Sequence, residues 1–479
     1  MVRPGFAQTG DASWSVCEYC PVTHQTLNPV DAIWLNSDRV ENLMVIEALV
    51  LLDGPIDRAR LERVLQHRVI DRYPVFRKRL VPARFPGGLP RWADVARFRI
   101  ADHIREVVIP APGEDVALQA YVAQFLSTPL PRDRPLWEIH LVEGLGVGTA
   151  MYVRLHHALA DGIALTRVLL ALTDEHPAMD DADRTHVPAA ASRPGGPRGA
   201  VPLLRRAWSA LARHVRPARL LSSATAVAQT GRIAGKLLLA RNPTTAMSGK
   251  AGAEKLVVWS APIPLAKVKD LARATDTTVN DILVTALAGA LQRYQTHHSD
   301  RAVDVRTMIP VNLRPLHKPL PAKLGNRFAV VLLTLPSGLA TPLARLRETK
   351  RRMDAIKRSP EALMTYGLIY GIGLTGSWLS RFVVRFFAAK ADAVTTNVPG
   401  PKEHRYLAGT RIHGLLGWVP GSSDQTLGTC IFTYAGMVRV GFKTDALAIP
   451  DPERILAAFH DELEALFELV TPVPVAAAV

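Results

Sequence analysis

The sequence predicts an α/β protein of two lobes, each a mixed sheet with flanking helices, and three observations support this. A chain of 479 residues exceeds what one hydrophobic core usually serves. Strand-like and helix-like patterns alternate in the first half of the chain and again in the second half. Between the halves, residues 186–203 are rich in Pro, Ala, Gly and Arg without periodicity, as in a linker. We therefore expect an N-terminal lobe over 1–185, a linker with a basic helical segment over 186–255, and a C-terminal lobe over 256–479.

Hydrophobic periodicity predicts the elements of the first half. They are a strand over 43–52, a helix from Asp57 with Leu61, Leu65 and Val69 on one face, a strand over 149–155 and a helix over 162–172. The second half repeats this style. Its elements are strands over 256–260, 303–309 and 328–335, helices after Pro264, from Thr278 and over 342–357, a hairpin over 429–442 turning at Ala435 and Gly436, and a last helix from Asp451 with Pro452 at its first position.

Two further segments are distinctive in composition. Residues 204–241 are basic and helix-prone, and residues 362–380 form the longest uncharged run. Gly, Thr, Ser and Tyr interrupt the second run, which favours a buried or interfacial helix over a membrane span. Both segments are candidates for contact with an anionic membrane or a lipid droplet. On pattern alone, a core or domain-spanning helix explains each equally well.

Charge and cysteine content narrow the function classes. The formal net charge of +15 favours phosphate-bearing partners such as nucleic acid, anionic lipid or a nucleotide-bearing cofactor. Nucleic-acid binding is not expected, because no zinc-finger or RNP-like motif accompanies the charge. The N-terminus lacks a secretory pattern, so we expect a cytoplasmic protein. Cys17, Cys20 and His24 resemble a zinc cluster but lack a fourth ligand, and we expect no metal.

The stretch "RLHHALADG" is the main candidate for chemistry. His156, His157 and Asp161 fall at a turn between a predicted strand and a predicted helix, and Gly162 permits close approach of the backbone or a positive φ. Three readings stay open for this stretch alone: structural histidines beside a helix cap, a metal site, or a general base that takes a proton from an attacking alcohol. A second pair, His297 and His298, follows a predicted helix, and we expect a solvated loop without a role.

With its glycine, "HHALADG" resembles the HHxxxDG motif of the CoA-dependent acyltransferase and condensation-domain superfamily. Further segments resemble those of the bacterial wax ester synthase/diacylglycerol acyltransferase family, in the family order. They are "TLNPVDAIWL" (26–35), "DRPLWEIHLVEGL" (133–145), "TVNDILVTALAGAL" (278–291), "VNLRP" (311–315), "LGNRF" (324–328), "TNVPGPKEHRYLAG" (396–409) and "TYAG" (433–436). The resemblance covers nearly the whole chain. It implies two chloramphenicol-acetyltransferase-like lobes with an active-site tunnel between them.

The resemblance implies roles for individual residues. His157 would be the general base, His156 would support it, and Asp161 would orient the site, with Arg314 as its partner. Asn280 would face the channel, next to Asp281; simple capping of their helix is the alternative for both. Trp137 would shape the site by packing, and Gly162 would adjoin the substrate. Asn397, Pro399 and Gly400 would form a rigid structural turn. Where the family carries serine, Thr433 keeps a hydroxyl.

The resemblance also implies an activity. The expected reaction is the transfer of a long-chain fatty acyl group from acyl-CoA to diacylglycerol or a fatty alcohol, by direct attack of the hydroxyl. No cofactor is expected beyond acyl-CoA as a substrate. Two alternatives are a condensation-like enzyme that uses carrier-protein-bound acyl groups and an inactive lipid-binding protein of the same fold. The sequence does not choose between the two acceptors, because pocket width is a tertiary property.

Overall fold

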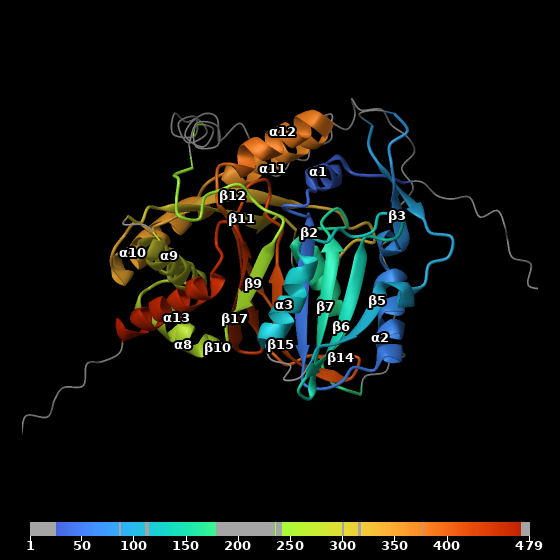
Figure 1. Ribbon diagram of the computed structural model, residues 1–479, viewed down its shortest axis with the longest axis horizontal. Coiled ribbons are helices and arrows are strands. Elements are labelled where there is room, and N and C mark those ends of the chain that lie inside the picture. The colour runs from blue at the N-terminus through green and yellow to red at the C-terminus, as the bar shows by residue number, and fades with distance from the viewer. Residues whose placement is uncertain are drawn as a thin grey trace, which may run out of the picture.

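The computed structural model describes residues 25–85, 88–110, 115–178, 235, 242–298, 301–314, 318–375 and 377–470. Two seven-stranded sheets with flanking helices dominate the described part, which confirms the predicted α/β class (Figure 1). Residues Cys17, Cys20, His24 and 186–203, and all of 204–241 except residue 235, lie outside the described residues. The predictions for those segments stay predictions.

The N-terminal sheet contains strands from both halves of the chain. In spatial order it comprises β5 (Ile104–Val108), β6 (Trp137–Leu145), β7 (Gly148–His156), β2 (Val45–Leu52), β15 (Thr410–Trp418), β14 (Tyr406–Leu407) and β8 (Thr173–Asp174). A separate small sheet holds β1 (Gln25–Thr26), β4 (Arg91–Asp94) and β3 (Lys78–Val81). The helices of this half are α1 (Pro29–Ser37), α2 (Arg58–Leu65) with a π-helical turn over Gln66–Ile70, two 3-10 turns (Pro74–Arg77 and Ile100–His103), α3 (Asp115–Phe125) and α4 (Gly162–Ala171).

The C-terminal sheet has its own core. Its order is β10 (Ile263–Pro264), β17 (Met437–Asp445), β16 (Leu427–Tyr434), β13 (Ala393–Pro399), β11 (Val305–Asn312) and β12 (Phe328–Leu335), with β9 (Lys255–Trp259) also paired to β17. The helices are α8 (Leu265–Ala274), α9 (Val279–His298), α10 (Pro342–Lys357), α11 (Glu361–Gly373), α12 (Ser377–Ala388) and α13 (Pro452–Glu468). Helix α9 is buried along most of its length and packs against α10 and α13.

Strand β15 joins the two halves, because it is late in the sequence yet pairs with β2 in the N-terminal sheet. A buried ion pair adds to this connection: Lys443 Nζ on β17 lies 3.3 Å from Glu47 Oε2 on β2. Burial raises the pKa of Glu47, and the nearby ammonium group of Lys443 opposes that rise. The two halves are therefore tied by a strand that crosses into the N-terminal sheet and by a charge pair.

Most predicted elements are confirmed, and three need correction. The strand expected over 303–309 is β11, shifted to Val305–Asn312. The run 362–380 is two helices instead of one, because α11 ends after Gly373 and α12 begins at Ser377. A Cβ at Gly373 would lie 2.6 Å from the carbonyl carbon of Pro29, so this glycine lets α11 end against α1. The pair His297–His298 is the last turn of α9, not a loop, because the helical pattern continues through both residues.

Candidate active site

The predicted strand-to-helix turn lies between β7 and α4. His156 is the last residue of β7, and its backbone N–H donates to the Leu136 carbonyl at 3.0 Å. The next N–H, of His157, donates to the Met44 carbonyl at 2.7 Å. Asp161 then caps α4, since its Oδ1 accepts from the N–H of Ala164 at 2.8 Å. Two backbone hydrogen bonds and one side-chain cap thus fix the loop that carries both histidines.

The His157 imidazole packs against two aromatic rings and is shielded from water. It stacks on Trp34 of α1 with ring centroids 4.5 Å apart, and Phe328 lies 5.4 Å away. Only 7% of the residue is exposed. Burial lowers the pKa of His157 to about 4, and hydrogen bonding around the residue and the charge of Asp161 oppose that shift only in part. The ring is therefore neutral at physiological pH, which is the form that accepts a proton.

Asp161 is paired with Arg314, as the resemblance implies. Arg314 Nε donates to Asp161 Oδ2 at 2.9 Å, and the Arg327 N–H donates to the same oxygen at 2.9 Å. Both side chains of the ion pair are almost fully buried. Every hydrogen bond recorded for this carboxylate goes to a cap or to the β11–β12 segment, so Asp161 fixes the loop between the two halves of the chain. That geometry suits orientation more than proton transfer.

His156 has a different environment from His157. The Ala158 N–H donates to His156 Nδ1 at 3.0 Å, so the ring proton of the neutral form is on Nε2. This Nε2 lies 3.5 Å from Asp38 Oδ2. Burial raises the pKa of Asp38, but hydrogen bonding and charge from His156 outweigh it and hold that pKa below its usual value. His156 therefore uses both nitrogens to shape the turn, which leaves His157 as the candidate base.

Asn326 and Asp31 were not singled out from the sequence, yet they support His157 through hydrogen bonds that start at its backbone carbonyl. Asn326 Nδ2 donates to the His157 carbonyl at 2.8 Å and also to Asp31 Oδ1 at 2.8 Å. The Asn326 N–H donates to the same Asp31 oxygen at 2.9 Å. Burial raises the pKa of Asp31 to about 6. These residues and Trp34 lie in the "DAIW" and "LGNRF" segments, so the resemblance contained the only sequence signal for them.

Asn280 and Asn397 meet at the N-terminal end of α9. Asn397 Nδ2 on β13 donates to Asn280 Oδ1 at 2.8 Å. The neighbouring Asp281 is fully buried and caps α9: its Oδ2 accepts from the Thr278 N–H at 2.9 Å, and the Asp281 N–H donates back to Thr278 Oγ1 at 3.2 Å. Thr278 and Asp281 thus form a capping box at the start of α9, whereas substrate contact by Asn280 or Asp281 stays a prediction.

The "NVPGP" turn packs against β16 as a rigid segment. Pro399, the last residue of β13, pairs in register with Thr433, and the Gly400 N–H donates to the Thr433 carbonyl at 2.8 Å. A Cβ on Gly400 would lie 2.4 Å from that carbonyl oxygen, so only glycine fits. The Thr433 hydroxyl lies 3.4 Å from the same N–H.

The conformational role expected for Gly162 is wrong. It has no positive φ, and a Cβ added to it would meet no heavy atom within 4 Å. Close backbone approach and a left-handed conformation therefore do not explain this glycine. Open space lies beside the first residue of α4, one residue after Asp161.

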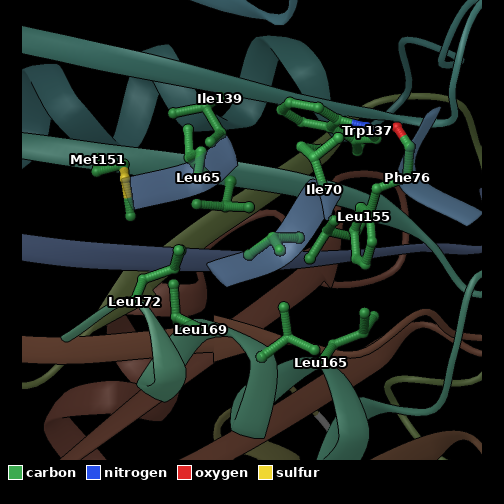
Figure 2. A pocket seen from close by; sticks show the side chains of 13 residues that line it. Leu65, Ile70, Phe76, Trp137, Ile139, Met151, Leu155, Leu165, Leu169 and Leu172 are labelled. Carbon is green, nitrogen blue, oxygen red and sulfur yellow. Dashed lines mark hydrogen bonds between the residues drawn. The ribbon is translucent and has the colours of Figure 1, made fainter. Parts of the chain in front are cut away.

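Trp137 lies in the wall of an apolar cavity of about 40 Å³ in the N-terminal half (Figure 2). It stacks on His103 at 4.3 Å, and its Nε1 donates to the Phe76 carbonyl at 2.8 Å. The thirteen side chains of the wall are all apolar in character and come mainly from the π-helical turn, β6, β7 and α4. Two elements of this wall, β7 and α4, also flank the histidine loop. Substrate contact by Trp137 stays a prediction.

The described residues contain no group of three or more His, Cys, Asp or Glu side chains that could hold a metal ion. Within the same residues, no helix is long and apolar enough to cross a membrane. What the site does offer is a neutral imidazole in a desolvated position, fixed by an ion pair and a hydrogen-bonded amide. Such an arrangement suits the removal of a proton from a hydroxyl group.

Comparisons with known proteins agree with the resemblance. The model of the wax ester synthase/diacylglycerol acyltransferase catalytic domain matches residues 27–283, and that of the WS/DGAT C-terminal domain matches residues 324–467. A Mycobacterium tuberculosis protein described as a probable diacylglycerol O-acyltransferase is 27% identical over 458 residues, covering 92% of this chain and 95% of that protein. A second one from the same organism is 28% identical over 471 residues, covering 92% and 98%.

Solved structures show the same fold. The wax ester synthase/diacylglycerol acyltransferase from Marinobacter aquaeolei VT8 superposes with a TM-score of 0.63 at 20% identity, covering 92% of this chain and 98% of that one. The first condensation domain of the calcium-dependent antibiotic synthetase superposes with a TM-score of 0.60 at 16% identity, covering 93% and 96%. The two-lobed architecture expected from the resemblance is thereby confirmed.

Proposed function

Because the chain belongs to the wax ester synthase/diacylglycerol acyltransferase family, we propose that it transfers a long-chain fatty acyl group from acyl-CoA to diacylglycerol or a fatty alcohol. The observation that carries the proposal is His157, a desolvated and neutral imidazole at the centre of the family's motif. An alcohol is barely ionised at neutral pH, so its attack on a thioester needs a base of this kind. Acyl-CoA is a substrate here, and we propose that no further cofactor takes part.

The reaction that we propose has two proton transfers and no covalent acyl-enzyme. His157 Nδ1 is buried, so Nε2 takes the hydroxyl proton as the oxygen attacks the thioester carbonyl. The tetrahedral intermediate then collapses, the C–S bond breaks and the CoA thiolate takes the proton back from Nε2. Asn280, next to Asn397, would donate from its amide to the developing oxyanion. Asp161 and Arg314 would hold the loop in place throughout.

Location follows from the chemistry of the acceptor. Diacylglycerols and fatty alcohols reside in membranes and lipid droplets rather than in water. We propose that the protein associates peripherally with the cytoplasmic face of a membrane or with lipid droplets. The positive net charge supports this, because it favours anionic lipid surfaces and CoA phosphates alike.

Thiol release from palmitoyl-CoA tests the proposal. Purified protein is offered dioleoylglycerol or hexadecanol in detergent micelles, and the lipid products are separated afterwards. We expect release that depends on an acceptor and yields triacylglycerol, wax ester or both. Release without any acceptor dependence, or none with either acceptor, would contradict the proposal. A parallel arm with an acyl carrier protein thioester as donor tests the condensation-like alternative.

A further inference from the structure

Helix α12 presents an unpartnered aromatic face. Trp378 is 70% exposed, Phe382 is 64% exposed and Phe386 is 36% exposed. These residues are four positions apart, so they form one line along the helix. Large aromatic side chains seldom stay in water unless something covers them in use.

The charged residues of helix α12 are both arginines. Arg381 and Arg385 are exposed on the same helix, and neither forms an ion pair with the described residues. Lys390 follows the helix, with its Nζ 4.3 Å from the centre of the Phe386 ring. Residues 362–391 contain no Asp or Glu at all. An aromatic face with arginines beside it and no acidic residue is complementary to an anionic lipid surface.

The neighbouring helix extends the apolar surface. On α11 and just after it, Leu363, Leu368 and Leu374 are each more than a third exposed. Helices α11 and α12 pack on each other, and both pack on α1 (Figure 1). We define the α11–α12 face by these three leucines together with Trp378, Phe382 and Phe386.

The α11–α12 face is linked to the active site through α1. Gly373, at the end of α11, touches the backbone of α1 at Pro29. Five residues further along α1, Trp34 stacks on the catalytic candidate His157. One short helix therefore separates the exposed surface from the proposed base.

We propose that the α11–α12 face docks on an anionic lipid surface, with its aromatic side chains in the interface and Arg381 and Arg385 at headgroup level. This rests on the proposed function, because it assumes that the acceptor is a lipid. Docking presents the active site to the layer in which diacylglycerol or fatty alcohol is dissolved. The acceptor then reaches His157 without crossing water.

Vesicle sedimentation tests the docking without any need for turnover. The full chain is mixed with vesicles of phosphatidylcholine alone or with added phosphatidylglycerol. We expect the wild type to sediment with the mixed vesicles and much less with phosphatidylcholine. The double variant Trp378→Ser/Phe382→Ser should bind about tenfold more weakly or worse, because two aromatic side chains that enter the lipid interface in the docked state are lost. The double variant Arg381→Glu/Arg385→Glu should lose the preference for phosphatidylglycerol.

A matched control comes from elsewhere on the surface. Leu447 is 78% exposed and lies outside this face, so Leu447→Ser removes an equally exposed apolar side chain and should leave binding unchanged. Equal binding by the wild type and both double variants would overturn the proposal, as would a self-association that the same substitutions abolish.

Activity separates this proposal from the proposed function. With dioleoylglycerol in detergent micelles, both double variants should keep the wild-type turnover. With dioleoylglycerol in mixed vesicles, they should lose it in proportion to binding. Turnover without vesicle binding by the wild type would overturn the docking surface alone, whereas binding without turnover would overturn the proposed function alone.

Discussion

The chain contains two adjacent histidine pairs, and they have little in common beyond the dipeptide. His156 is the last residue of a strand and His157 follows it, and both are almost fully buried. His297 and His298 end a helix and are exposed. His298 Nε2 lies 3.3 Å from Asp451, and its ring packs on Tyr294. The difference shows that a site depends on the groups that arrive from distant parts of the chain: at His157 these are a tryptophan, an amide and a guanidinium-fixed loop.

The largest expected effect is the loss of the base itself. His157→Ala should lower kcat by roughly two to four orders of magnitude, because that is the usual contribution of a general base. The matched variant His298→Ala changes the other pair and should leave kcat within error of the wild type. Palmitoyl-CoA turnover with a saturating acceptor measures both. Similar losses of kcat in the two variants would mean that His157 has no special catalytic role.

The second effect concerns the ion pair that fixes the loop. Arg314→Met leaves the Asp161 carboxylate buried without its cation, which should cost about 3–5 kcal/mol in the free energy of unfolding as well as activity. The control Arg58→Met breaks two partly exposed pairs, with Glu62 and with Glu106, and should cost far less. Urea denaturation compares the variants. A wild-type unfolding free energy for Arg314→Met would show that the pair is dispensable to the fold.

The sequence predicted the pairing of Asp161 with Arg314 but not the residues that pack against and support His157. The β7–α4 turn was predictable because the alternation of residues 149–155 and the helical spacing after Gly162 are local signals. The pairing of Asp161 with Arg314 was reached through the resemblance. The stacking of Trp34 on His157 was not reached, since it depends on where α1 packs. Local patterns could not predict that strand β15 joins the N-terminal sheet, because this depends on its pairing with the distant strand β2.

A third prediction tests the groups that sequence reasoning missed. Asn326→Ala removes the amide that donates both to the His157 carbonyl and to Asp31, so the buried carbonyl loses this partner and Asp31 Oδ1 keeps only the backbone N–H of residue 326. We expect a loss of about 1–3 kcal/mol in stability and about a tenfold fall in kcat with KM unchanged. Asp31→Asn keeps an oxygen that accepts from Asn326, so it should be milder in both measurements. Equal losses for the two variants would argue that the carboxylate charge matters more than the amide bridge.

The smallest expected effect concerns the pH dependence of kcat/KM: the pH below which activity is lost should be lower than for an ordinary histidine base. An ordinary histidine base would lose activity below about pH 6.5. Burial lowers the pKa of His157 to about 4, so the imidazole stays neutral well below that pH, and kcat/KM should hold until the limb near pH 4. The same shift means that the unfolded chain binds the proton first, so this histidine's contribution to stability is lost as pH falls from about 6.5 to about 4.

The pKa of Asp31 is shifted in the opposite direction to that of His157, so the two residues have opposite effects on stability as pH falls. Burial raises its pKa to about 6, so the folded state takes up its proton first, and its contribution to stability grows as pH falls from about 6 towards the ordinary value of 3.8. The two shifts therefore largely cancel in stability. Proton uptake on Asp31 Oδ2 leaves Oδ1 free to accept both bonds from Asn326, so the geometry behind His157 persists. A pH–rate profile measured alongside unfolding at each pH checks this, and a limb near pH 6.5 in a fully folded protein would mean that His157 is better solvated than its aromatic surroundings indicate.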